Sequence, residues 1–448
     1  MFSKKEMIKL MIPLVLEQIL NATVGMADTL MVSAVGESAI SGVSLVDNIN
    51  TLLYTLFSAL CNGGAIITAH FIGSHREEDA RNSAANLIFS SGVVAFILGI
   101  VALAGNKFFI SLFYGSIEQN VMHYARIYFF FSAFAYVFIA LYNSCSSLFR
   151  VMGITRVSLL ASVMANIINI CGNALFLFVF NWGVVGIALA TLIAKASSAM
   201  FMVSVLTKQD RIVYLDLKKI FRPSWGMIKQ IMSIGIPNGI ESSLFQIGKV
   251  LVSGITAMLG TTAVAANAVA GTITNFAIIP GTAVSLAITT VVGQIAGAGD
   301  NKLAVKKART LLLWSYLCMG ITCMLLFALC PYIVSLYNLE EVTKDLALEI
   351  IKFFSIVCLL LWSPSFIIPS ALRAVKEVKY TMVVSIASMW IWRILLAYVF
   401  AIHMDIGILG VWMAMGVDWL CRSICFYIRF FHGKWQNRPV LEPERENV

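Results

Sequence analysis

The chain has 448 residues, of which 59% are hydrophobic and only 12% are charged. A soluble domain of this length carries about 25% charged residues, so the composition excludes an ordinary water-soluble fold and predicts a protein surrounded mostly by lipid. The formal net charge of +9 would suit a nucleic-acid binder, but the basic residues flank apolar segments, which indicates membrane orientation and no nucleic-acid partner.

Twelve apolar segments follow one another along the chain, each long enough to cross a bilayer as a helix. They lie near residues 10–34, 48–72, 86–105, 124–147, 157–180, 184–206, 230–258, 270–296, 309–330, 347–371, 380–402 and 407–430. The first segment follows lysines, as a signal peptide would, but it contains Glu17 and Asp28 and lacks a convincing cleavage site. We therefore expect it to be a retained span.

Lys and Arg concentrate in one set of segments: the N-terminus, the connections after every second span, and the C-terminus. This asymmetry predicts that both termini are cytoplasmic, in a multi-pass protein of the plasma or inner membrane. We expect a monomer whose partners are a small-molecule substrate and the lipid bilayer.

The two halves of the sequence superpose over long stretches at one constant offset. This offset aligns Pro13 with Pro237, Glu17 with Glu241, Gly36 with Gly260, Gly73 with Gly297, Gly183 with Gly407 and Gly186 with Gly410. Each repeat holds six spans, so both repeats start on the same side of the membrane. The predicted fold class is an all-α membrane protein with twelve transmembrane helices, in two parallel six-helix lobes related by pseudo-twofold symmetry along the membrane normal.

The predicted domains are an N-terminal lobe (1–206), a basic cytoplasmic linker (207–229), a C-terminal lobe (230–431) and a polar, frayed cytoplasmic tail (432–448). Two such lobes leave a cleft near the midplane, where transporters of this construction hold their substrates. A membrane enzyme is the weaker alternative. The five histidines are not spaced as metal ligands, and no catalytic constellation is recognisable.

Ionisable side chains inside the spans are functional candidates, because each costs roughly 2.5–3.5 kcal/mol to insert. Glu17, Asn21 and Asp28 share one face of the first span. Asn169 and Asn173 on the fifth span and Thr191 on the sixth lie at the depth of Asp28. A carboxylate among amide and hydroxyl oxygens suits Na⁺, and a desolvated carboxylate can bind a proton instead. We predict a cation-coupling site, with Na⁺ as the metal if one binds, at Asp28, Asn169, Asn173 and Thr191; a structural hydrogen-bond network is the alternative.

Other intramembrane polar residues are candidates for lining the substrate cleft: Glu17, Asn21, Lys195, Glu241, Gln246, Lys249 and Arg393. Glu17 and Glu241 either line the cleft or cap the helix bends at their prolines. Arg393 is either a cleft cation or a stacked structural arginine. Asp418 and Arg422 stand four residues apart, which predicts an ion pair along one helix.

Several motifs resemble those of the multidrug and toxic compound extrusion (MATE) family, in order and spacing over nearly the whole chain. They are DTLMVSAVG (28–36), FRVMG (149–153), NICGNALFLF (169–178), WGVVGIALAT (182–191), IPNGIESSLFQIGKVLVSGITAMLG (236–260) and, more weakly, LRAVK (372–376). The resemblance implies a twelve-helix secondary transporter that exports organic, often cationic compounds by antiport with H⁺ or Na⁺, without another cofactor.

In part of that family, an Asp on helix 1 couples to the cation with an Asn and an Asp on helix 5 and a Thr on helix 6. These positions fall on Asp28, Asn169, Asn173 and Thr191. Asn173 replaces the second carboxylate, which argues against tight Na⁺ binding and favours H⁺. A second family arrangement, with acidic residues in helices 7 and 10, is incomplete here: Glu241 is present, but the tenth span has no acidic residue.

The nearest rival function is that of a flippase for lipid-linked oligosaccharides, which resembles these exporters in fold. A flippase would need a strongly cationic cleft to hold pyrophosphate, whereas the intramembrane charges here have mixed signs. Lys195, Lys249 and Arg393 nevertheless leave a zwitterionic or anionic substrate open.

Overall fold

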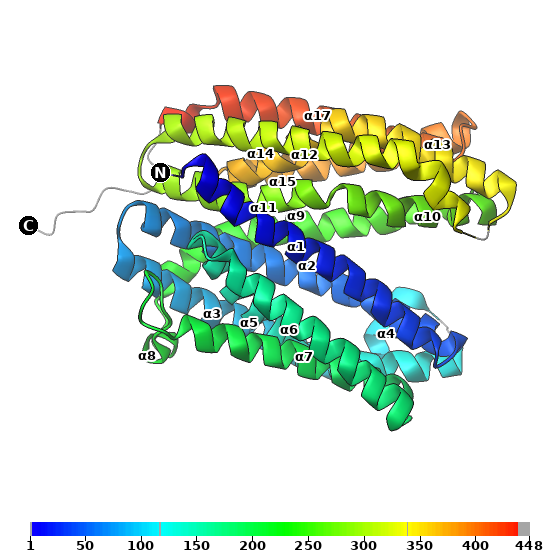
Figure 1. Cartoon of the computed structure of the whole chain (residues 1–448), viewed down its shortest axis with the longest axis horizontal. Coiled ribbons are helices and arrows are strands. Elements are labelled where there is room, and N and C mark those ends of the chain that lie inside the picture. The colour runs from blue at the N-terminus through cyan, green and yellow to red at the C-terminus, as the bar shows by residue number, and fades with distance from the viewer. Residues whose placement is uncertain (1, 116–117, 338, 438–448) are drawn as a thin grey trace, which may run out of the picture. The chain divides into compact units, whose positions relative to one another are not determined.

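The structure is a computed structural model that describes residues 2–115, 118–337 and 339–437 (Figure 1). Regular secondary structure in the described residues is helical throughout. Large apolar side chains such as Phe96, Phe178 and Leu317 are more than half exposed along these helices. Surface of this kind is unfavourable in water and suits contact with lipid.

The first compact unit runs from Ile12 to Gly239. Its elements are α1 (Lys4–Ser33) from Ile12 on, α2 (Glu37–Gly73), α3 (Glu77–Ala104), α4 (Asn106–Tyr114), α5 (Gln119–Val151), α6 (Thr155–Ala174), η1 (Leu175–Val179), α7 (Gly183–Leu206), α8 (Leu217–Ile220) and α9 (Trp225–Ala257) up to Gly239.

The second compact unit joins the residues up to Met11 with those from Ile240 on. Its elements are the rest of α9, then α10 (Thr261–Ala277), α11 (Ile279–Gly297), α12 (Asn301–Ser335), α13 (Glu341–Val357), η2 (Cys358–Trp362), α14 (Ser363–Ala374), α15 (Val378–Ser388), η3 (Met389–Leu395), α16 (Leu396–Tyr398), η4 (Val399–His403), α17 (Ile408–His432) and η5 (Lys434–Asn437).

The described helices join into twelve long rods that correspond to the twelve expected spans. Ten helices in the described residues are long and apolar enough to cross a membrane by themselves. The other two rods, α1 and α9, have 30 and 33 residues, or about 45–50 Å at 1.5 Å per residue, which exceeds the hydrocarbon thickness.

The eighth expected span, residues 270–296, is wrong in detail. The structure starts this rod at Thr261 and divides it into α10 and α11 at Ile278. Pro280 follows directly, and because proline cannot donate a backbone hydrogen bond it interrupts a continuous helix. Apolar periodicity alone did not reveal this break.

Both compact units differ from the expected lobes at helix ends. The first half of α9 belongs to the first unit, where the Asn238 side chain donates to the Ala59 carbonyl at 2.9 Å. The start of α1 belongs to the second unit, where Lys307 Nζ donates to the Phe2 carbonyl at 2.7 Å. The predicted lobes divide the chain at the basic linker, and this division does not predict that the ends of α1 and α9 pack in the other unit.

The basic linker is attached to the start of α3. Arg81 Nε donates to the Ile212 carbonyl at 3.0 Å, and Lys219 pairs with Glu78 at 3.2 Å. The Ser224 backbone N–H donates to Asn86 Oδ1 at 2.8 Å. The linker therefore packs against α3 within the first unit.

The expected frayed tail is wrong for its first residues. Trp435 is 4% exposed and stacks near Phe430, with ring centroids 5.2 Å apart. Gln436 donates to two carbonyls at the end of α17, and its own carbonyl accepts from Asn301. The indole supplies apolar burial that a count of polar residues overlooks. Residues 438–448 of the predicted tail lie outside the described residues.

Paired features in the two halves establish the register of the repeat. Gly36 and Gly260 precede α2 and α10 with φ of 130° and 92°, a backbone conformation that only glycine adopts easily. The π-helical segments η1 (175–179) and η4 (399–403) are separated by the same offset as these two glycines.

Candidate functional site

A polar cavity of about 460 Å³ lies inside the first unit. Its lining comes from five helices, α1, α2, α5, α6 and α7, and consists of Asn21, Gly25, Asp28, Thr51, Tyr54, Thr55, Ser58, Ile139, Tyr142, Asn143, Ser162, Ala165, Asn166, Lys195 and Ser198. Of the predicted residues, Asn21, Asp28 and Lys195 meet here. A cavity of this size, lined by amides and hydroxyls around one carboxylate, can hold a small organic molecule.

The four predicted coupling residues form one hydrogen-bonded chain beside this cavity. Asn173 Nδ2 donates to Asp28 Oδ1 at 2.9 Å and to Asn169 Oδ1 at 3.2 Å. Asn169 Nδ2 donates in turn to Thr191 Oγ1 at 3.1 Å. Three rods, α1, α6 and α7, thus bring side chains that are far apart in sequence into a single network.

The oxygens of this network fit a hard cation. They comprise a carboxylate, two amide oxygens and a hydroxyl, the ligand types that such cations prefer. Asn173 is completely buried, and its Oδ1 has no hydrogen-bond partner among the described residues. A buried acceptor left unpaired costs free energy, and a bound cation would satisfy it.

The charges around the first cavity have a negative excess. Asp28 interacts electrostatically with Lys195, and also with Asp47 on α2. In the same unit, outside the cavity lining, the charges of Glu17 and Arg150 compensate each other. Three carboxylates against two cations favour a positively charged group in the cavity.

Asp47 is a residue that the sequence interpretation missed. Its carboxylate is hydrogen-bonded by the side chains of Tyr128 and Asn50. The expected second span started at residue 48, so Asp47 was assigned to a connection, whereas α2 begins at Glu37. Hydroxyls at Thr51, Thr55 and Ser58 also line the cavity; their spacing of four and three residues is a signal that could have located this face.

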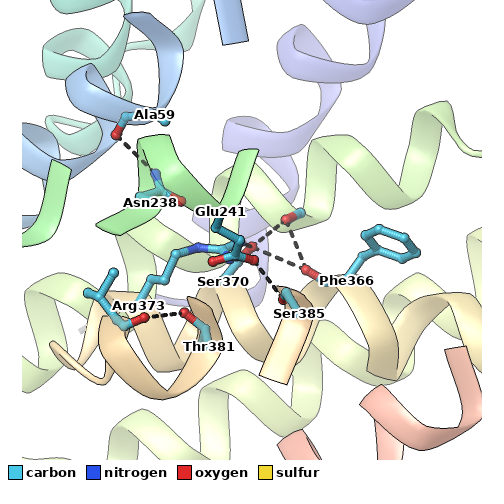
Figure 2. A network of polar contacts seen from close by, with 10 residues as sticks. Ala59, Asn238, Glu241, Phe366, Ser370, Arg373, Thr381 and Ser385 are labelled. Atoms are coloured by element: carbon cyan, nitrogen blue, oxygen red, sulfur yellow. Dashed lines mark hydrogen bonds and ion pairs between the residues drawn. The ribbon is translucent and has the colours of Figure 1, made fainter. Parts of the chain in front are cut away.

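Glu17 and Glu241 occupy equivalent places and have equivalent partners. Tyr142 donates to Glu17 Oε1 at 3.3 Å, and Arg150 lies within electrostatic reach of the same carboxylate. In the second unit, Arg373 pairs with Glu241 at 3.2 Å and Ser385 donates to it at 2.8 Å, as Figure 2 shows. Both glutamates therefore interact with the arginine of their own repeat.

The remaining predicted residues lie in the second unit. Lys249 and Arg393 line a separate cavity of about 250 Å³, whereas Gln246 is half-buried on α9 and does not line it. The expected ion pair between Asp418 and Arg422 is wrong: Asp418 lies 3.7 Å from Arg393 instead. Arg393 reaches Asp418 from the neighbouring rod. The Cζ atom of Arg422 lies 4.8 Å from the centroid of the Phe366 ring.

Comparison with known proteins decides the family. The MatE family model matches residues 13–175 and 237–399, one match in each half and offset by the repeat. The chain belongs to the MatE family. The resemblance of its motifs to these transporters is thereby confirmed.

Two relatives of this MatE chain have similar length. It is 25% identical to the "Probable multidrug resistance protein NorM" of Thermotoga maritima, over 99% of this chain and 95% of that protein. It is 26% identical to the "Uncharacterized transporter YisQ" of Bacillus subtilis, over 94% of this chain and 93% of that protein.

A solved structure described as the outward-facing conformation of a multidrug resistance MATE family transporter matches with a TM-score of 0.86 at 21% identity, over 96% of this chain and 95% of that one. The predicted fold class, an all-α membrane protein of twelve helices in two lobes, is confirmed by such matches. The chain is a multi-pass membrane transporter of the MatE family.

Proposed function

We propose that this transporter exports small organic compounds, cationic or amphipathic, by antiport with H⁺ or Na⁺. The observation that carries the proposal is the chain of hydrogen bonds from Asp28 through Asn173 and Asn169 to Thr191, at the wall of a polar cavity. A carboxylate at the cavity wall can hold the coupling cation or the substrate's positive charge, but not both, because the two would repel each other. Such competition is the physical basis of exchange.

The single carboxylate in the network favours H⁺ over Na⁺. Asn173 adds an amide where a second negative charge would be, so less charge is available to compensate a desolvated Na⁺. A proton forms a covalent O–H bond with one carboxylate and does not need a complete ligand shell.

Membrane placement forms part of the same proposal. We infer that the protein lies in the plasma or inner membrane as a monomer, with both termini cytoplasmic. Arg81 and Lys219, at the connection between α7 and α9 and the start of α3, belong to the basic side that this orientation places in the cytoplasm. We propose transport, and not catalysis, as the role of this arrangement.

Flux measurements in proteoliposomes test the proposal. Purified protein is reconstituted, and export of a fluorescent organic cation such as ethidium is measured with a pH gradient or a Na⁺ gradient imposed separately. We expect the pH gradient to drive ethidium movement, and ethidium to drive proton movement in return, since coupling is reciprocal. Absence of ethidium flux under both gradients would contradict the proposal, and flux under the Na⁺ gradient alone would refute the proton preference.

A further inference from the structure

The second unit holds a cavity of about 250 Å³ whose lining, as far as the structure describes it, has two cations and no carboxylate, whereas Asp28 and Lys195 both line the first cavity. Lys249 from α9 and Arg393 from η3 line it, together with Ser253, Thr256 and Asn267. Trp412 Nε1 donates to Asn267 Oδ1 at 3.1 Å. That bond occupies the amide oxygen, which leaves the amide nitrogen of Asn267 as a donor for a ligand.

The positive charges around this cavity exceed the negative ones. Arg393 has one partial partner, Asp418, at 3.7 Å, and its buried Nε has no hydrogen-bond partner among the described residues. Lys249, which is accessible, has no carboxylate within ion-pair distance in the described part of the chain, and the charge that acts on it is the repelling one of Arg393.

The other charged groups near this cavity do not compensate the positive charges of Lys249 and Arg393. The charged groups linked by electrostatic contacts around this cavity are four cations (Lys249, Arg373, Arg393 and Arg422) and two carboxylates (Glu241 and Asp418), an excess of two positive charges. Three of these cations lie 5.5–5.8 Å from the ring of Phe245. A ring quadrupole offsets part of a desolvation cost but supplies no negative charge.

The cavity occupies the place in the second repeat that the coupling site occupies in the first. At the repeat offset, Lys249 corresponds to Gly25, Val252 to Asp28 and Met415 to Thr191, and all three residues of the second repeat line the second cavity. Tight contacts support the register on both sides: Gly186 packs against Phe176, and Gly410 against Phe400.

Arg393 occupies the helical turn that corresponds to Asn169. The start of α15 at Val378 falls one position short of the repeat offset from the start of α6 at Thr155, whereas η4 keeps the offset from η1. An extra residue therefore lies between α15 and η4. The π-helical segment η3 accounts for it, and π-bulges of this kind often mark functional sites. The second repeat thus has a guanidinium in the turn where the first has an amide, and a valine where the first has its carboxylate.

From this difference in charge between the repeats we infer that the cavity between Lys249 and Arg393 binds an anionic oxygen group, a carboxylate or phosphate, carried by the transported compound. The inference rests on the proposed function and extends its substrate class from organic cations to amphipathic zwitterions, whose carboxylate or phosphate this cavity binds. A planar guanidinium, an ammonium, an amide N–H donor and hydroxyls are the groups that recognise such oxyanions.

Equilibrium binding with a matched pair of probes tests this site. The full chain in lipid nanodiscs is titrated with norfloxacin, a zwitterion, and with its methyl ester, which keeps the cationic amine but lacks the carboxylate. No ion gradient is present, so the result does not depend on coupling. We expect norfloxacin to bind about tenfold more tightly or better, the value of one good charge-assisted contact.

Four variants locate the effect. Lys249→Met should abolish the preference for norfloxacin while leaving ester binding unchanged, and Lys249→Arg should retain it. Lys352→Met, which removes another cation of the second half, should leave the preference intact. Val252→Asp places a carboxylate beside Lys249, at the position that corresponds to Asp28, and should also abolish the preference. This variant tests the site if Lys249→Met does not fold.

Four outcomes would overturn the inference: equal affinity for the two probes in the wild type, no saturable binding of either, a preference that survives both Lys249→Met and Val252→Asp, or displacement of norfloxacin by inorganic phosphate at similar concentration, which would indicate an inorganic-anion site. If the wild-type protein prefers norfloxacin but shows no ion-coupled flux in proteoliposomes, the proposed antiport is refuted and the anion site is not.

Discussion

At the scale of single residues, Asp28 is the group on which exchange is expected to depend. Within the network it accepts a hydrogen bond from the amide of Asn173, and the opposite charge that acts on it is Lys195. Because Asn173 and Asn169 are fully or nearly fully buried, they keep their orientation and cannot substitute for a lost charge. The carboxylate is therefore the one titratable member of the four-residue chain.

Replacing Asp28 with asparagine should abolish coupled transport and leave the fold intact. The substitution keeps size and hydrogen-bonding capacity and removes the charge and the proton site, so gradient-driven ethidium flux should fall about tenfold or more. Size-exclusion elution should not change. Asp210→Asn is the matched control, since Asp210 is 71% exposed in the linker and pairs with its neighbour Arg211. Wild-type flux in Asp28→Asn would remove this residue from the mechanism.

Lys195 should set the pH range of transport. Its ammonium interacts with Asp28 and favours the ionised carboxylate. In Lys195→Ala the carboxylate binds a proton more readily, so the pH profile of coupled flux should move to higher pH by about one unit or more. Lys195→Arg should keep the wild-type profile. A profile in Lys195→Ala that superposes on the wild type would show that Lys195 is merely structural.

At the scale of elements, π-helical segments and close glycine contacts set how each rod packs. The backbone of η1 lies directly against α7 at Gly186, where an added Cβ would come within 2.7 Å of the Phe176 Cβ and 3.2 Å of its carbonyl. Neither neighbour is a flexible chain end, so this contact admits no side chain. It holds α7, and with it Thr191 and Lys195, at a fixed distance from α6.

Substitution of Gly186 by valine should therefore destabilise the first unit. Overpacking of this kind costs about 1–3 kcal/mol, and the unfolding midpoint of the purified protein in detergent should fall. Gly92→Ala is the control: it lies mid-helix in α3, no heavy atom of the described residues is within 4 Å of the added Cβ, and alanine is the better helix former. An unchanged midpoint in Gly186→Val would mean that α7 can shift freely.

The ion pair between Glu241 and Arg373 ties α9 to α14 (Figure 2). The side chains are 9% and 19% exposed, so removing one partner leaves a charge without compensation. Arg373→Ala or Glu241→Gln alone should cost about 3–5 kcal/mol of unfolding free energy, and the double variant less than the sum. Strictly additive losses in chemical denaturation would contradict a direct pair.

At the scale of the whole molecule, twelve rods and two equal repeats require that connections alternate between the two membrane faces. An epitope tag after Asp210 should react with antibody only in permeabilised cells, and one after Glu340 should react in intact cells. Both sites are exposed, so insertion should not disturb packing. Reaction of both tags from the same side would refute the six-plus-six arrangement.

Residue patterns were sufficient to predict the class of protein, the number of rods, the repeat and the members of the polar network around Asp28. Hydrocarbon imposes a strong rule on chain segments, because unpaired backbone groups and charges are costly there, so apolar length and the rare polar residue are informative without tertiary contacts. Asp28, Asn169, Asn173 and Thr191 could be grouped from helical periodicity and depth alone.

The choice of partner for each polar group depends instead on how the rods pack. Asp418 meets Arg393 from another rod rather than Arg422 one turn away, because a short lateral distance between packed helices competes with the local spacing of four residues. Asp47 lies at the site because α2 begins at Glu37, well before the apolar run of this helix. Arg393 from η3 and Lys249 from α9 line one cavity, and which rods meet there is a property of packing that residue spacing does not encode.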